Sequence, residues 1–213
     1  MSLKLHVFPL SPRAFKVLWA ANHLGLDYEL SYIDLTKGEQ KREEFLALNP
    51  NGKMPVLEHD GFSLWESNAI VNYLSHLKPD AGLLPADVKA RVKAMQWQFW
   101  DSTSWDPACA MLVFERVVKR LLKLGEPNPA EIERGEAKFA TAAQVLDGQL
   151  QKHRYVAGDK LTVADFSVGA ALNAAEAAQY PLGPYRAIAR WHAELKAMPA
   201  WGKTAALQMS KAA

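Results

Sequence analysis

The stretch FLALNPNGKMPVLEHDGFSLWESNAIVNYL, residues 45–74, decides the fold of the first part of the chain. Two short apolar runs, Pro55–Glu58 and Phe62–Leu64, flank a His-Asp-Gly turn, and this pattern predicts a β-hairpin. Glu66–Leu77 then repeats apolar residues at helical spacing. We therefore expect two antiparallel strands followed by a helix.

Toward the N-terminus, strand and helix patterns alternate. Leu3–Phe8 alternates apolar and polar residues as a strand does, and Arg13–Leu24 has helical spacing and ends before a glycine. Tyr28–Leu35 reads as a second strand and Glu43–Leu48 as one short helix. A strand, a helix and a strand within so few residues predict a right-handed parallel crossover. The expected order is βαβ followed by ββα.

The pattern changes near residue 80. The segment KPDAGLLPA, Lys78–Ala86, contains proline and glycine, and no strand signal follows it. Helices are expected at Val88–Leu124, Ala130–Gln151, Val163–Ala178 and Pro184–Ala197, with a last short segment after them. Pro107 should interrupt or kink the first of these helices. We expect an α/β domain over residues 1–78, a linker over 79–86 and an all-helical domain over 87–213.

The composition excludes several function classes. The chain has 213 residues, 49% of them hydrophobic, and carries 25 Lys and Arg against 23 Asp and Glu. This balance lacks the basic excess that nucleic-acid binding requires. No apolar run reaches the ~18 residues of a membrane span, and no signal peptide is expected. The single cysteine excludes an internal disulfide, so we expect a reduced, cytoplasmic location. The six histidines are scattered, so no metal site is expected.

Ser11 lies between a strand end and a helix start, and Pro12 takes the favoured first helical position. A serine hydroxyl there either caps the helix only or also faces an anionic ligand at the helix N-terminus. Serine hydrolase chemistry is disfavoured, because the chain has no Gly-x-Ser-x-Gly elbow around this residue.

Two further segments have the chemistry of a peptide-binding site. Pro55 opens a strand after a turn, so the Met54–Pro55 bond is either a cis peptide that presents the Met54 main chain to an extended peptide, or a trans bond at an edge strand. Glu66 and Ser67 begin a helix, where they suit the ammonium and the carboxylate of a zwitterion. Ordinary first-turn polarity is the alternative for this pair.

The segment GDKLTVADF, residues 158–166, reads as a folding signal rather than a site. Thr162 and Asp165 have the spacing of a capping box, and Leu161 and Phe166 that of a hydrophobic staple. We therefore expect a helix that begins at this point and is held by local contacts.

Taken together, four motifs carry a family resemblance. FPLSPRAFKV, FLALNPNGKMPVLEHDGF, LWESNAIVNYL and GDKLTVADF occur in this order over nearly the whole chain. The combination resembles the cytosolic glutathione S-transferases, specifically the serine-type members of the theta- and phi-like classes and their bacterial relatives. The resemblance implies a thioredoxin-like N-terminal domain, a helical C-terminal bundle and a homodimer.

The implied activity is glutathione transfer. The enzyme would bind glutathione as a cosubstrate, stabilise its thiolate and conjugate it to hydrophobic electrophiles, with glutathione peroxidase chemistry as a side activity. No cofactor would be bound permanently, and neither nucleic acid nor a membrane would be a partner. A non-catalytic glutathione-binding or regulatory protein on the same fold is the alternative.

The resemblance also assigns residues. Ser11 matches the serine that activates the glutathione sulfur, and Phe8 stands where a tyrosine-type enzyme would place its tyrosine. The implied glutathione-binding residues are Gln40, Lys41, Lys53, Met54, Pro55, Glu66 and Ser67. Solvated surface lysines remain the alternative for Lys41 and Lys53.

The electrophile pocket is expected near Leu10, Arg13 and Trp105, although the aromatic residues of segment 95–114 also suit helix packing. Cys109 reads as a small apolar residue.

Overall fold

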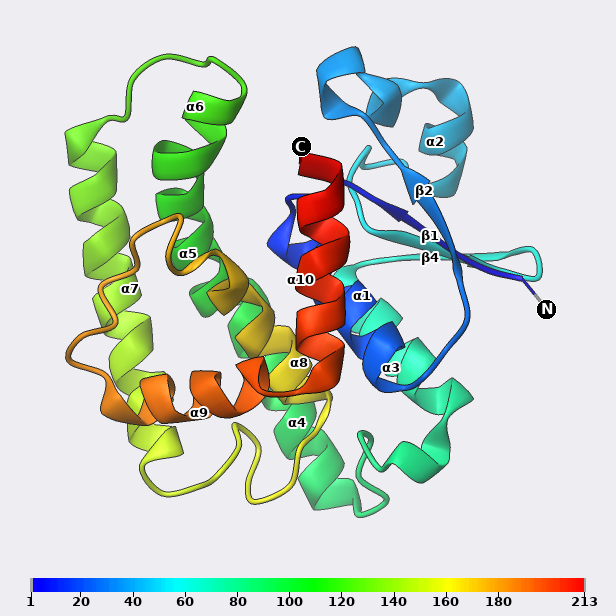
Figure 1. Cartoon of the computed structure of the whole chain (residues 1–213). Coiled ribbons are helices and arrows are strands. Elements are labelled where there is room, and N and C mark those ends of the chain that lie inside the picture. The colour runs from blue at the N-terminus through cyan, green and yellow to red at the C-terminus, as the bar shows by residue number, and fades with distance from the viewer. Residues whose placement is uncertain (1, 213) are drawn as a thin grey trace. The chain divides into compact units, whose positions relative to one another are not determined.

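A four-stranded mixed sheet organises the first part of the computed structural model, which describes residues 2–212 (Figure 1). The strands lie in the order β2 (Glu29–Tyr32), β1 (Leu3–Val7), β3 (Val56–His59) and β4 (Phe62–Trp65). β1 and β2 are parallel, whereas β1–β3 and β3–β4 are antiparallel. The predicted βαβ unit and hairpin are both confirmed.

Three helices accompany this sheet: α1 (Pro12–His23), α2 (Glu43–Leu48) and α3 (Ser67–Leu77). Leu5 and Val7 of β1 are fully buried. The side chain of His6 points to the opposite face because strand side chains alternate. On that face the His6 ring meets Phe45 of α2 edge to face, with the ring centres 6.1 Å apart. The sheet is therefore covered on both faces, with α2 on the side of His6.

The second strand is shorter than expected. The pattern predicted Tyr28–Leu35, but β2 ends at Tyr32, and a 3₁₀ turn, η1 (Leu35–Lys37), follows. Asp34 caps this turn by accepting a hydrogen bond from Thr36 N–H at 2.9 Å. A second 3₁₀ turn, η2 (Glu39–Lys41), precedes α2. The capping aspartate thus ends the strand before its apolar pattern does.

The last helix, α10 (Pro199–Ala212), packs against α1 at the other end of the sequence. Trp201 places its ring 4.7 Å from Phe15 and 4.9 Å from Trp19, and Asn22 donates a hydrogen bond to Thr204 at 2.8 Å. The chain consequently divides into a first unit, Met1–Leu84 with Ala197–Ala213, and a second unit, Pro85–Lys196.

This division differs from the expected one, which placed the whole of 87–213 in the helical domain and expected only a short last segment. α10 spans 14 residues, and it joins the first unit because Trp201 is buried against α1. A buried aromatic ring contributes several kcal/mol of apolar burial, which local sequence patterns do not assign to a partner.

The described residues of the second unit form helices joined by loops, and the only β pairing among them is an isolated bridge between Tyr155 and Gly158. The expected helix Val88–Leu124 is continuous to Leu121, but two wide π-helical turns interrupt its regular spacing. Its parts are α4 (Val88–Trp100), η4 (Asp101–Trp105), α5 (Asp106–Val113), η5 (Phe114–Val118) and α6 (Lys119–Leu121). The first wide turn ends two residues before Pro107, which has no N–H for the helical ladder. The expected interruption is therefore confirmed.

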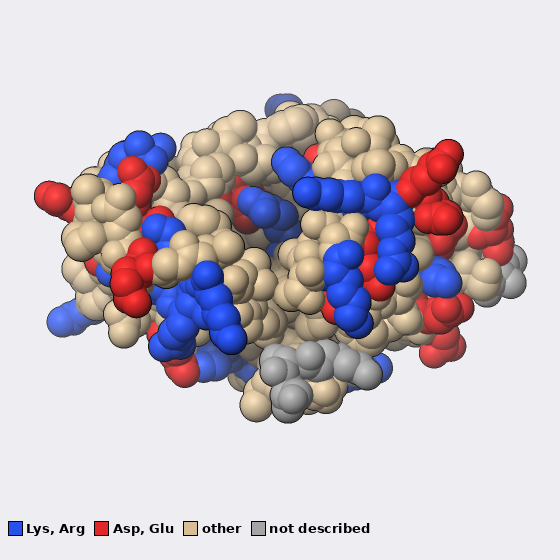
Figure 2. All heavy atoms as spheres, turned by 90° about the horizontal axis from the view of Figure 1, so that it is seen from above, with Lys and Arg blue, Asp and Glu red and all other residues tan. Residues whose placement is uncertain are grey.

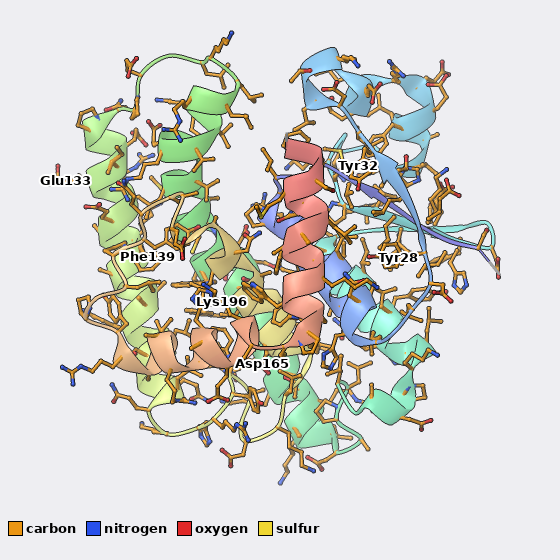
Figure 3. All side chains as sticks on the ribbon, viewed as in Figure 1. Tyr28, Tyr32, Glu133, Phe139, Asp165 and Lys196 are labelled. Atoms are coloured by element: carbon orange, nitrogen blue, oxygen red, sulfur yellow. The ribbon has the colours of Figure 1, made fainter. Side chains whose placement is uncertain are left out.

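The other helices of this unit are α7 (Pro129–Leu150), α8 (Val163–Gly169) and α9 (Arg186–Lys196). The helix expected over 163–178 changes to a 3₁₀ turn at Ala170–Ala174. Phe139 and Asp165, labelled in Figure 3, lie in the interior of the unit and are fully buried. Within residues 2–212, no helix combines the length and apolarity needed to cross a bilayer.

Charged side chains of both signs occupy the molecular surface. Figure 2 shows Lys and Arg beside Asp and Glu over the face seen there. This mixture agrees with the count of 25 basic and 23 acidic residues in the sequence.

Candidate functional site

The register of the sheet brings three predicted site segments to one edge. His6 of β1 pairs with Val56 of β3, and Val56 pairs with Trp65 of β4. Because these neighbours are antiparallel, the end of β1, the start of β3 and the end of β4 share that edge. Ser11 follows the first, Pro55 precedes the second and Glu66 follows the third. Residues distant in sequence thus meet on one rim of the first unit.

Ser11 is the N-cap of α1 and is partly exposed. Its N–H donates to the carbonyl of Phe8 at 3.1 Å, and its own carbonyl accepts from Phe15 N–H at 2.9 Å. Its Oγ accepts a hydrogen bond from Ala14 N–H at 3.3 Å. A serine hydroxyl has one proton and two lone pairs, so this cap leaves the proton available for a further acceptor.

Two buried side chains that the sequence analysis did not single out support the helices that begin at this rim. Gln208 of α10, only 8% exposed, donates a hydrogen bond from Nε2 to the Ser11 carbonyl at 3.2 Å. Lys16 of α1, only 4% exposed, donates from Nζ to Asn68 Oδ1 at 2.8 Å and so ties α1 to the first turn of α3. Neither contact has a local sequence signal, because each joins elements far apart in the chain.

Glu66 has an unusual backbone conformation at the start of α3. It is the N-cap residue, and its φ of 72° lies in the left-handed region that few non-glycine residues adopt. Such conformations cost about 1–3 kcal/mol and cluster at functional positions. Its side chain is exposed, whereas Ser67 beside it is buried. The strained backbone is a signal that the sequence alone did not reveal.

The loop before β3 is organised by Asn49. This residue is buried, donates from Nδ2 to the Lys53 carbonyl at 2.6 Å, and accepts from Asn51 N–H at 3.0 Å. The bond between Met54 and Pro55 is cis, the first of the two conformations considered for it. The turn chemistry predicted for this segment therefore serves to hold the main chain of residues 51–55 in place.

Gly52 brings this loop against η2. Its φ is +60°, and a Cβ at this position would lie 3.0 Å from the carbonyl oxygen of Gln40. Only glycine fits both constraints without strain. Lys41 and Lys53 are exposed, while Oε1 of Gln40 is buried and has no hydrogen-bond partner within residues 2–212. The segments that carry the two predicted lysines thus lie in contact.

The residues predicted for an electrophile pocket separate into two groups. Leu10 and Arg13 flank Ser11 and are exposed. Trp105 is 0% exposed in the second unit, where its indole N–H donates to the Val168 carbonyl at 2.9 Å and its ring lies 5.0 Å from Phe139. A ring without accessible surface does not line a pocket, so the expectation for Trp105 is corrected: it is a core residue.

No group of three or more His, Cys, Asp or Glu within the described residues is arranged to hold a metal ion. Cys109 is free and buried, and burial raises the pKa of its thiol well above the usual range, with the nearby Asp106 adding to the effect. A thiol held in its protonated form is a poor nucleophile. This environment is that of a small apolar residue in a helix core.

Comparison with known proteins places this geometry in a family. Residues 1–76 match the model of the glutathione S-transferase N-terminal domain, and residues 129–194 match that of the C-terminal domain. Glutathione S-transferase 3 from Zea mays is 36% identical over 96% of this chain and 93% of its own. A glutathione S-transferase from Hyoscyamus muticus is 32% identical over 95% and 97%. The structure of glutathione S-transferase-I bound with lactoylglutathione superimposes with a TM-score of 0.89 at 25% identity, covering 97% of this chain and all of the other.

Proposed function

The chain belongs to the glutathione S-transferase family and is a glutathione transferase, and we propose that it is a serine-type, phi- or theta-like member in which Ser11 stabilises the thiolate of glutathione. The observation that carries this proposal is the position of Ser11 Oγ, which accepts from Ala14 N–H at the N-terminus of α1. Because Oγ accepts from Ala14 N–H, its own proton is available to the sulfur. The same N–H polarises the hydroxyl and strengthens it as a donor.

The energies of one hydrogen bond and of the helix N-terminus are together large enough to ionise the glutathione thiol without a general base. A thiol with a pKa near 8.5 is only a few per cent ionised at pH 7. Lowering that pKa by about two units requires about 2.7 kcal/mol of preferential thiolate stabilisation. A hydrogen bond to a charged sulfur supplies about 1.5–3 kcal/mol, and the N-terminus of the 12-residue helix α1 adds up to about 1.

The remaining groups suit the rest of the tripeptide. The exposed carboxylate of Glu66 would bind the ammonium of the γ-glutamyl end, and Ser67 with the first N–H groups of α3 would bind its carboxylate. The main chain of Met54, held by the cis bond to Pro55, would pair with the cysteinyl part. Lys41 and Lys53, with Gln40 beside them, would bind the glycine carboxylate.

The thiolate then attacks an electrophilic carbon and forms a C–S bond; with a chloronitrobenzene, the C–Cl bond breaks and chloride leaves with its electron pair. The exposed side chains of Leu10 and Arg13 flank Ser11 and are proposed to contact a hydrophobic electrophile. As a side activity, the same sulfur would attack the O–O bond of a hydroperoxide and release an alcohol, and a second glutathione would then convert the resulting sulfenic acid to glutathione disulfide and water. The enzyme would need no permanently bound cofactor, and the buried, unpaired Cys109 suits the reducing conditions of the cytoplasm.

The test is Ser11→Ala, with Ser63→Ala on the exposed surface of β4 as the control. Loss of the hydrogen bond should lower kcat/KM for a chloronitrobenzene substrate about 10- to 100-fold while the affinity for glutathione changes little. Equal turnover in Ser11→Ala and the control would remove Ser11 from this role. Glu66→Ala should instead weaken retention on a glutathione column.

A panel of electrophiles and hydroperoxides separates the enzyme from a non-catalytic glutathione-binding protein on the same fold. Turnover with any of them supports the transferase. Firm retention on immobilised glutathione without turnover across the panel would favour the binding protein.

We further propose that the chain forms a homodimer. One side of α4 carries exposed apolar residues at spacings of four, three and four positions. These residues are Val88, Val92, Met95 and Phe99. Such a stripe is typical of a helix face that packs against another protein surface. Light scattering should give a dimer mass for the native chain and a monomer mass for Val92→Glu. A monomeric native chain would refute the proposal.

A further inference from the structure

We propose that Gln208 is a positioning residue that holds the Ser11 backbone in its thiolate-stabilising geometry; this inference rests on the role proposed above for Ser11. Gln208 lies on α10, 197 residues away in sequence, and is almost fully buried. Its Nε2 donates to the Ser11 carbonyl oxygen at 3.2 Å. Burying the Gln208 amide without a hydrogen-bond partner would cost free energy. Its bond to the Ser11 backbone is therefore a specific contact.

A contact at the Ser11 carbonyl influences where the Ser11 side chain lies, because it orients the backbone that carries this side chain. This carbonyl already accepts from Phe15 N–H at 2.9 Å, the first hydrogen bond of α1. A second donor from outside the helix fixes the orientation of this peptide group and with it the ψ of 126° at Ser11. The direction of the Cα–Cβ bond follows from that backbone, so the position of Oγ relative to a bound sulfur depends on both donors.

The packing of α10 along α1 explains why Gln208 reaches this point. Trp201 contacts Phe15 and Trp19, and Thr204 pairs with Asn22 near the C-terminal end of α1. Gln208 lies about one helical turn beyond Thr204 and contacts the N-terminal end. Within residues 2–212, the hydrogen bonds of Thr204 and Gln208 both join α10 to the segment of α1, and the bond of Gln208 ends on Ser11.

This pair of contacts supplies a matched experiment. Gln208→Met keeps the length and flexibility of the side chain but removes the donor. Thr204→Val removes the hydroxyl oxygen that accepts from Asn22 Nδ2 and keeps the β-branched shape. Thr204→Val should lose at least as much stability as Gln208→Met, because it removes both the bond from Asn22 and the bond from the Thr204 hydroxyl to the Ala200 carbonyl at 2.7 Å. They differ in whether the lost bond ends on Ser11.

The readout is the pKa of the thiol of bound glutathione, taken from the ultraviolet absorbance of the thiolate and from the pH profile of kcat/KM. In Gln208→Met this pKa should rise, so that kcat/KM falls about fivefold at pH 6.5 and less than about twofold at pH 9. Thr204→Val should keep the native profile. Equal shifts in both variants would show a general packing effect and overturn the proposal, as would a native profile in Gln208→Met.

Ser11→Ala, measured in the same way, separates the two proposals. If Ser11→Ala raises the thiol pKa and Gln208→Met does not, the role of Ser11 stands and that of Gln208 fails. If Ser11→Ala leaves the pKa unchanged, the proposed activation by Ser11 itself is wrong.

Discussion

Asp165 should be the side chain of the second unit whose loss destabilises that unit most clearly. It is fully buried, and four hydrogen bonds converge on its carboxylate. Val156 N–H and the indole N–H of Trp191 donate to Oδ1 at 2.9 and 3.1 Å. Thr162 donates to Oδ2 from N at 2.9 Å and from Oγ1 at 3.3 Å, which completes the capping box predicted from the sequence.

Asp165→Ala removes these four acceptor contacts and leaves buried donors without partners. At about 1 kcal/mol for each bond, the free energy of unfolding should fall by about 4 kcal/mol, which is at the high end for a single substitution. Urea unfolding should show the loss as a lower midpoint with an unchanged slope. Asp159→Ala, a control in the same loop, removes two long contacts of an exposed side chain, 3.4 Å to Arg154 N–H and 3.7 Å to His153 Nδ1, and should cost less than about 0.5 kcal/mol. Comparable losses in both variants would refute the account.

The pH dependence gives a second measurement at this residue. Burial raises the pKa of Asp165 from 3.8 to about 6, even though the hydrogen bonds oppose this shift. The folded state therefore binds the proton more tightly than the unfolded state, and the contribution of this group to stability falls as pH rises from about 4 to about 6. A shift of about two pKa units corresponds to about 3 kcal/mol. Asp165→Asn does not titrate, so the stability of the native chain relative to this variant should decrease across that window. An increase instead would show that the carboxylate form is favoured.

Two glycine substitutions test the close approaches in the two units. Gly52→Ala should cost about 1–2 kcal/mol and raise the KM for glutathione, because a Cβ at this φ of +60° meets the Gln40 carbonyl at 3.0 Å; a native KM would separate this loop from glutathione binding. Gly135→Ala should lower the thermal midpoint, because its Cβ would lie 2.9 Å from Cδ2 of Leu112. The control Gly148→Ala, on the same helix, meets no atom within 4 Å and should raise the free energy of unfolding by about 0.5–1 kcal/mol. A change of the same sign in both variants would contradict the packing argument.

Much of the fold follows from local patterns. The strand–turn–helix segments of residues 3–77 appear within a few residues of their predicted bounds, because alternation, helical spacing and turn residues act over short distances. The helix Glu43–Leu48 has the predicted bounds, and the capping box of Thr162 and Asp165 is present. The motif order also identified the family, which the matching domain models and relatives confirm.

Other features could not be predicted in this way. Aromatic residues at helical spacing have the same pattern in a core and in a pocket wall, so the burial of Trp105 required the packed unit. The sequence also left the Met54–Pro55 bond undecided, because a proline after a turn fits both the cis and the trans isomer.

The amino-acid sequence by itself determined the elements, their order, the caps and the family, because each depends on neighbouring residues or on motifs that keep their spacing. Only the tertiary structure decided that α10 joins the first unit and that Gln208 and Lys16 contact Ser11 and Asn68. These contacts join residues up to 197 positions apart. Their partners are selected by the burial of whole helix faces, and no local pattern encodes which faces meet.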